Sequence, residues 1–246
     1  MSIWKVASAT VVTLFVAACG SSGVSKKPMT ATPERKGAAK GTVEAGLKLN
    51  KLKTNSKDTD AINAFSEIYA DASQLTGSVQ ADAVSGKLVS ALSDNIDQCV
   101  TESGGTVTYN QCDFNGTKVN GTVKIQGDVI SIDLTIEASG GISGGVSSVN
   151  LHYVGSVTVS DTKIDGSLDV TTDVGTTEYG TVSANTSVDF NAIVVTSGCA
   201  TGGSMDVNSV TSAAGHSYTT AVTVTFGPNC GDMTMTGGTD LPGMGG

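Results

Sequence analysis

The sequence has 246 residues, of which 39% are hydrophobic and 4% are aromatic, and its formal net charge is -9 at pH 7. The acidic charge argues against a nucleic-acid-binding protein, because the folded part would repel phosphate groups. The low aromatic content argues against a carbohydrate site or a site for a large apolar ligand, which Trp and Tyr side chains usually line.

The first residues have the pattern of an export signal. Lys5 precedes an apolar run over residues 6–18, which is shorter than the roughly 20 apolar residues of a transmembrane helix. The stretch Val16-Ala17-Ala18-Cys19 resembles the lipobox of bacterial lipoproteins. The resemblance implies that residues 1–18 are a signal peptide that is removed, and that Cys19 then carries acyl chains such as palmitate. An ordinary signal peptide that contains a cysteine is the alternative.

Residues 19–57 are interpreted as a basic, flexible tether behind this anchor. Gly20 and Ser21 follow the cysteine, which by the sorting rule of enterobacterial lipoproteins favours the outer membrane. From Gly20 to Lys57 nine basic and two acidic residues give a charge of +7, whereas residues 58–246 have four basic and 21 acidic residues, a charge of -17. The stretch has little to bury. Its lysines would contact anionic headgroups of the membrane or keep the linker soluble.

Residues 58–98 have the spacing of amphipathic helices. In the first half, which Asp58 or Thr59 can cap, the apolar side chains recur every three or four residues, at Ile62, Phe65, Ile68, Tyr69 and Ala72. Gly77 interrupts the pattern before a second stripe, formed by Val84, Leu88, Leu92 and Ile96. We expect one or two helices that pack on the sheet of the same domain. Contact with a membrane is the lesser alternative, because the polar faces hold Asp and Ser instead of Lys and Arg.

Residues 99–236 have the alternation of antiparallel strands. Val, Ile and Leu alternate with Thr, Ser and Asp in runs that Gly, Asn and Asp separate, which predicts one apolar and one polar face for each strand. The chain is therefore expected to be mainly β, an antiparallel coiled sheet or barrel-like meander of about 8–11 strands with the N-terminal helices packed on it. Residues 237–246 lack the pattern and are expected to form a disordered tail.

Two similar stretches, residues 117–125 and 162–170, decide where these strands turn. Each contains a pair that favours a two-residue hairpin, Asn120-Gly121 in the first and Asp165-Gly166 in the second. A hairpin at either pair would scatter the apolar side chains over both faces, whereas a continuous strand keeps them on one face. We therefore predict a strand through each pair.

Four of the predicted strands place a glycine on the apolar face, at Gly121, Gly155, Gly166 and Gly180. Glycine weakens a strand unless the sheet bends there or another group approaches closely. The glycines therefore favour a sheet that coils around the N-terminal helices. The alternative interpretation is functional: the four glycines would line the concave face of the sheet and make room for an apolar ligand.

Four cysteines remain when Cys19 is set aside, and an even number in an exported chain predicts two disulfides. Three pairings exist, and closeness in sequence favours Cys99 with Cys112 and Cys199 with Cys230. We expect neither a cofactor nor a metal, because no Cys-x-x-Cys pair and no nearby histidine supplies the spacing of zinc ligands.

Two further patterns invite an enzymatic or metal-binding interpretation. Residues 141–145 match the G-x-S-x-G pattern of serine hydrolases, with Ser143 as nucleophile and His152 or His216 as base, but that motif needs a helix after it, and a strand-like run follows instead. Aspartates recur every four residues at Asp161, Asp165, Asp169 and Asp173. On a strand such neighbours are about 13 Å apart, too far for one calcium ion. They are expected to keep the sheet soluble, to prevent pairing of its edges, or to contact a basic partner.

Together these patterns predict a lipid-anchored protein of the bacterial cell envelope without enzymatic activity, which has a structural role or binds another envelope protein. The alternative is a carrier or receptor with an apolar ligand in the concave face of the sheet, similar in plan to the half-open barrels that carry lipoproteins through the periplasm. A serine hydrolase that uses Ser143 is the remote alternative.

Overall fold

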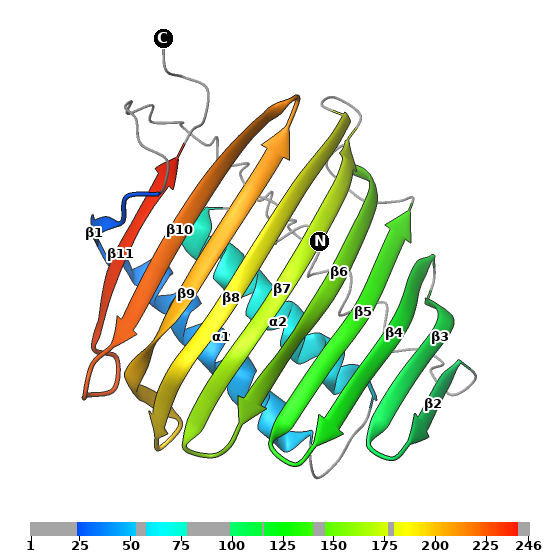
Figure 1. Cartoon of the computed structure of the whole chain (residues 1–246), viewed down its shortest axis with the longest axis horizontal. Coiled ribbons are helices and arrows are strands. Elements are labelled where there is room, and N and C mark those ends of the chain that lie inside the picture. Colours follow the sequence, from blue (N-terminus) through cyan, green and yellow to red (C-terminus); the bar gives the residue numbers. More distant parts are fainter. Residues whose placement is uncertain are drawn as a thin grey trace, which may run out of the picture.

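The computed structural model describes residues 24–52, 58–77, 99–114, 116–139, 146–176 and 180–240. They form one antiparallel sheet of eleven strands with two helices, α1 (Pro33–Lys51) and α2 (Asp58–Thr76) (Figure 1). The strands are β1 (Lys27–Met29), β2 (Val100–Ser103), β3 (Thr106–Phe114), β4 (Thr117–Gln126), β5 (Val129–Ser139), β6 (Val146–Val159), β7 (Lys163–Thr176), β8 (Gly180–Thr196), β9 (Cys199–Ala213), β10 (His216–Phe226) and β11 (Met233–Asp240). The predicted fold class is confirmed.

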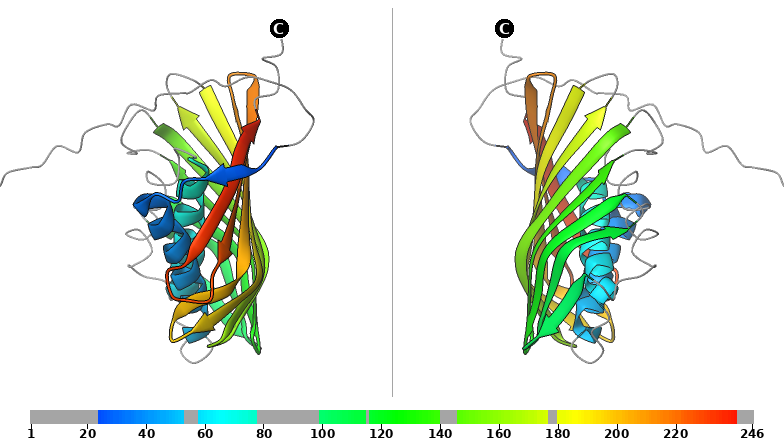
Figure 2. Two further views of the ribbon diagram at one scale, coloured as in Figure 1. Left: turned by 90° about the vertical axis from the view of Figure 1, so that its left-hand side faces the viewer. Right: turned by 90° about the vertical axis from the view of Figure 1, so that its right-hand side faces the viewer.

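The sheet is an open meander. From β2 to β11 each strand pairs with the next one in the sequence, and β1 adds to the free side of β11, so that β1 and β2 are the edges of the sheet. Both helices lie on the same face of the sheet, which curves around them (Figure 2). The apolar inner face forms one core with the helices, whereas the outer face carries Thr, Ser, Asn and Asp side chains. This is the alternation that antiparallel strands with one solvated face require.

Helix α1 corrects the prediction of a flexible tether over residues 19–57. The helix begins after Thr32, whose side chain caps it, and has Pro33 in its first turn. One side of α1 is buried, mainly through small side chains: Ala38, Ala39, Thr42, Val43, Ala45, Gly46 and Leu49. Alanine and glycine give only a weak apolar pattern, and with exposed lysines between them the sequence of α1 is similar to that of a soluble linker. The sequence analysis missed the helix for this reason.

Helix α2 confirms the first half of the helical prediction. Phe65, Ile68 and Tyr69 are at most 1% exposed, as their spacing on one face predicts. At Gly41 of α1 the Asp71 side chain of α2 occupies the space that a Cβ would need. The second predicted helical stripe, residues 78–98, lies outside the described residues.

Strand β4 runs through Asn120-Gly121 and β7 runs through Asp165-Gly166, so both pairs lie inside strands, as predicted. Gly121 has a φ of 127° and Gly166 a φ of 123°, values that residues with a side chain rarely adopt. At Gly121 a Cβ would overlap with the backbone of β5. These glycines let neighbouring strands approach one another and the sheet coil.

A bulge bends the sheet beside the β8–β9 hairpin. The pairing of β8 with β9 shifts register between Asn191 and Val195. Within this shift Ala192 has a φ of 49°. The backbone of Ala192 lies so close to Gly203 of β9 that no side chain would fit at position 203. Such bulges kink a strand and increase its twist. The bent hairpin reaches the side of the sheet where α1 lies, and the two line a common cavity.

Strand β11 corrects the predicted tail, because residues 237–240 belong to the sheet. This end of β11 is held between β10 and the N-terminal segment: Thr239 pairs with Thr220, and Met29 of β1 and Val24 cover Gly237 and Gly238. The stretch is rich in glycine and has no apolar alternation, so its strand conformation depends on these neighbours. Residues 241–246 lie outside the described part of the chain.

Candidate functional site

Three of the four glycines predicted to line a ligand face, Gly121, Gly155 and Gly166, lie in close contact with the backbone of a neighbouring strand. A Cβ on Gly155 would overlap with the backbone of β7, and a Cβ on Gly166 would overlap with the backbone of β6. Large buried side chains flank them, with Leu168 beside Gly155 and Phe190 beside Gly166. Gly180 lies at the exposed start of β8. Neighbouring strands and core side chains occupy the space beside Gly155 and Gly166, whereas no atom lies within 4 Å of the place of a Cβ on Gly180. A ligand face formed by the four glycines stays a prediction.

Both predicted disulfides are present. Cys99–Cys112 joins the residue before β2 to β3, and Cys199–Cys230 joins the first residue of β9 to the loop between β10 and β11. The Cα–Cα distances are 5.2 Å and 5.5 Å, within the usual range for disulfides. The second disulfide holds two connections at the same end of the sheet.

An apolar cavity of about 260 Å³ lies between α1 and the Cys199–Cys230 disulfide. Its lining consists of Lys36, Gly37, Lys40, Val43 and Glu44 of α1 together with Gly198, Cys199, Ala200, Phe226, Cys230, Gly231 and Met233 of the sheet end. Val43 is 3% exposed and Phe226 is 6% exposed, so the wall is part of the apolar core. Sequence reasoning missed the cavity because its two sides are far apart in the chain. With α1 recognised as a helix, two features of its sequence could have indicated the cavity: Lys36 and Lys40 one turn apart, and Gly37 between them.

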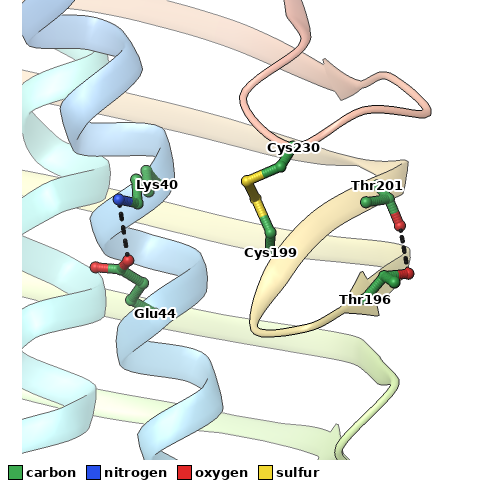
Figure 3. The surroundings of a disulfide bond; sticks show 6 residues. All are labelled: Lys40, Glu44, Thr196, Cys199, Thr201 and Cys230. Atoms are coloured by element: carbon green, nitrogen blue, oxygen red, sulfur yellow. Dashed lines mark hydrogen bonds and ion pairs between the residues drawn. A yellow bond between two sulfur atoms is a disulfide. The ribbon is translucent and has the colours of Figure 1, made fainter.

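The rim of this cavity carries charged side chains of α1. Lys40 and Glu44 extend from the helix, with the disulfide across from them (Figure 3). Lys40 Nζ is 3.4 Å from Glu44 Oε1, a pair at the i,i+4 spacing that stabilises helices. Lys36 lies one turn earlier, so two lysines and one glutamate give the rim a net positive charge. On the far side of the disulfide, the hydroxyls of Thr196 and Thr201 are 3.0 Å apart and join the two strands next to the turn of the β8–β9 hairpin (Figure 3).

Two carboxylates meet on the outer face of the sheet, where Asp189 of β8 is directly opposite Asp206 of β9. Partial burial and the charges of Asp169 and Asp206 raise the pKa of Asp189. Partial burial acts in the same direction on Asp206, but hydrogen bonds from Thr223 and Lys26 outweigh it and hold the pKa of Asp206 below its usual range. Lys26 Nζ is 3.0 Å from Asp206 Oδ1. The N-terminal segment is thereby tied to the outer face.

The residues of the hydrolase hypothesis are not brought together in the described structure. Ser143 lies outside the described residues. His152 Nε2 is 3.0 Å from Asp133 Oδ1 on the exposed outer face, whereas His216 is the first residue of β10. The position of Ser143 relative to either histidine is therefore not described.

The described residues contain no group of three or more His, Cys, Asp or Glu side chains that could hold a metal ion. The spaced aspartates at the start of β7 have protein partners instead. Asp161 accepts a hydrogen bond from the Asn50 side chain, and Asp165 forms an ion pair with Lys163 at 2.7 Å. The hydrogen bond from Lys163 holds the pKa of Asp165 below its usual range.

No protein-family model, curated protein or solved structure matches this chain. In the part of the chain that the structure describes, neither helix is apolar enough to cross a membrane. The functional assignment therefore depends on the residues of this chain alone.

Proposed function

We propose that this chain is a lipid-anchored protein of the bacterial cell envelope, held at the outer membrane, with a non-catalytic role in binding another envelope component. The main support for this proposal is the number and the positions of the cysteines. The sequence has five cysteines, and four of them form two disulfides, bonds that persist in oxidising compartments outside the cytoplasm. The fifth is Cys19, at the acylated position of the lipobox-like stretch.

The described domain begins close to this anchor. Val24, the first described residue, is only five residues after Cys19, and five residues span at most about 18 Å. Lys26, two residues further along, forms an ion pair with Asp206 of β9 on the outer face of the sheet. With Cys19 acylated, the sheet is held against the membrane surface and not at the end of a long tether.

The outer face of the sheet is the surface that suits a binding role. Val154 of β6 is 41% exposed and lies between Asp133 of β5 and Asp169 of β7. Nearby, the facing carboxylates of Asp189 and Asp206 repel each other, an arrangement that destabilises a strand pair. An apolar contact surrounded by acidic groups fits a partner that presents an apolar side chain among basic ones.

The Cys19→Ser variant tests the anchor. The wild-type protein is expected in the membrane fraction, with an intact mass that corresponds to a chain beginning at an acylated Cys19. The variant is expected to carry no acyl group, with both disulfides still formed. A wild-type chain that carries no acyl group, or that has free thiols, would contradict the proposal.

A photo-crosslinking residue at position 154 tests the binding role in intact cells. We expect a crosslink to a defined envelope protein that disappears when Asp133 and Asp169 are both replaced by lysine. The matched control replaces the exposed Asp232 of the β10–β11 loop by lysine and is expected to leave the crosslink unchanged. A crosslink that is insensitive to the charge reversal would argue against the acidic outer face as the binding surface.

A further inference from the structure

The cavity beside the Cys199–Cys230 disulfide has the lining of a hydrocarbon site. Val43 of α1, Phe226 of β10 and Met233 of β11 contribute apolar side chains to its wall. Its volume of about 260 Å³ exceeds the roughly 150 Å³ of an apolar cavity that accepts benzene. A hydrocarbon chain of medium length therefore fits, and its transfer from water is favoured in proportion to the apolar area that it buries.

Gly37 leaves the α1 side of this cavity open. Two other glycines of α1 have packing reasons: Gly41 gives room to Asp71, and a Cβ on Gly46 would be 3.2 Å from the Ile164 side chain. At Gly37 no atom lies within 4 Å of the place where a Cβ would be. Glycine weakens the interior of a helix relative to alanine, so packing and helix stability both favour a larger residue. Gly37 belongs to the lining of the cavity and is exposed, so a larger side chain there would be added at its α1 side.

The rim supplies a positive charge. Among the described residues that line the cavity, Glu44 is the only acidic one, and it forms an ion pair with Lys40. The charge of Lys36, one helical turn before Lys40, is therefore not balanced within the lining. Lys36 is exposed on α1, where its flexible side chain can reach an anionic group at the mouth of the cavity.

We propose that this cavity binds a fatty acid anion of medium chain length. The hydrocarbon chain lies against Phe226 and Met233, and the carboxylate lies at the rim beside Lys36. The disulfide and the bulge at Ala192 hold the sheet side of the cavity in place opposite α1. The site is separate from the outer face and does not depend on acylation of Cys19.

Calorimetric titration with decanoate and with decanol, which has the same chain but no charge, tests the proposal. The protein is the full mature chain with Cys19→Ser, because an acyl anchor could itself compete for the cavity. We expect one decanoate per chain and about tenfold weaker binding of decanol. Lys36→Gln is expected to weaken decanoate binding about tenfold and to leave decanol binding unchanged.

Gly37→Leu adds a large apolar side chain to the lining of the cavity without removing a contact, and Gly37→Ala is the matched control. Both substitutions favour the helix, and circular dichroism checks that both variants are folded. We expect Gly37→Leu to abolish decanoate binding and Gly37→Ala to keep it within about threefold of the parent protein. In the parent protein, the methyl resonance of Met233 is expected to shift on titration with decanoate.

Three results would overturn the proposal. One is the absence of saturable decanoate binding to the parent protein. Another is unchanged binding by a folded Gly37→Leu variant, or an unperturbed Met233 methyl resonance, since the ligand would then bind elsewhere. The last is equal affinity for decanoate and decanol with no effect of Lys36→Gln, which would rule out recognition of an anion.

Discussion

The hydroxyl groups of Tyr69 and Thr172 are 2.7 Å apart and join the buried face of α2 to β7 in the core. Tyr69 is 1% exposed and Thr172 is 0% exposed. A buried hydroxyl that loses its partner costs about 1–3 kcal/mol. Tyr69→Phe keeps the ring, which packs edge-on against Tyr153, but leaves Thr172 without this partner. We expect the variant to lose about 1–2 kcal/mol in the free energy of unfolding, measured with urea.

The double variant Tyr69→Phe with Thr172→Val is the control for that measurement. It removes both hydroxyls, so no polar group of the pair remains buried without its partner. Its cost is expected to be smaller than the sum of the two single costs. Additive costs would show that the two hydroxyls do not stabilise each other.

Gly121→Ala should destabilise the sheet. The substitution places a methyl group against the backbone of β5, and it demands a φ of 127° that alanine rarely adopts. We expect a loss of at least about 2 kcal/mol in the free energy of unfolding. Gly37→Ala is the matched control: with no neighbour to collide with, it should stabilise the protein by about 0.5–1 kcal/mol. Equal effects of the two substitutions would contradict the local geometry described for Gly121.

Asp71 should make stability depend on pH. Burial and the nearby charges of Glu67 and Glu44 outweigh the opposing Lys48 and raise its pKa from 3.8 to about 6. Because this pKa is raised on folding, the stabilisation from the neutral carboxyl is complete below about pH 4 and is lost as the pH rises through 6. Asp71→Asn should therefore be more stable than the wild type at pH 7, by about 1 kcal/mol because Asp71 is only partly buried and solvent screens its charge.

The measurement for Asp71 is the difference in unfolding free energy between wild type and Asp71→Asn from pH 4 to pH 7. We expect the difference to grow in favour of the variant as the pH rises. Glu137→Gln, on the exposed outer face, is the control for replacing a carboxyl by an amide. A pH-independent difference for Asp71→Asn would show that this carboxyl does not titrate in the window.

Removal of the Cys199–Cys230 disulfide should lower stability and open the cavity. The bond closes a loop with a sequence separation of 31, and such bonds stabilise proteins by about 2–4 kcal/mol. Replacement of both cysteines by serine should lower the thermal midpoint and weaken decanoate binding. The matching replacement of Cys99 and Cys112 should also lower the midpoint but leave decanoate binding intact, because that pair is not part of the cavity lining.

The antiparallel meander could be predicted from the sequence because it follows from local patterns. Side chains alternate between the two faces of a strand whatever its neighbours are, so the pattern around Asn120-Gly121 was sufficient to place β4. The pairing of Cys199 with Cys230 followed from closeness in the sequence. The acyl anchor at Cys19 stays a prediction, since it depends on a short stretch outside the described residues.

Helix α1, the filled inner face and the cavity were decided only by the tertiary structure. The small side chains of α1 are buried because a curved sheet and α2 enclose them, and nothing in their own hydrophobicity indicates it. From the sequence, a glycine such as Gly155 could have indicated either a groove or close packing of neighbouring strands. In the structure the backbone of β7 packs closely against Gly155. The cavity brings Val43 to Met233, which are distant in the chain. Such contacts depend on strand register and sheet curvature, which are properties of the whole sheet and not of any one segment.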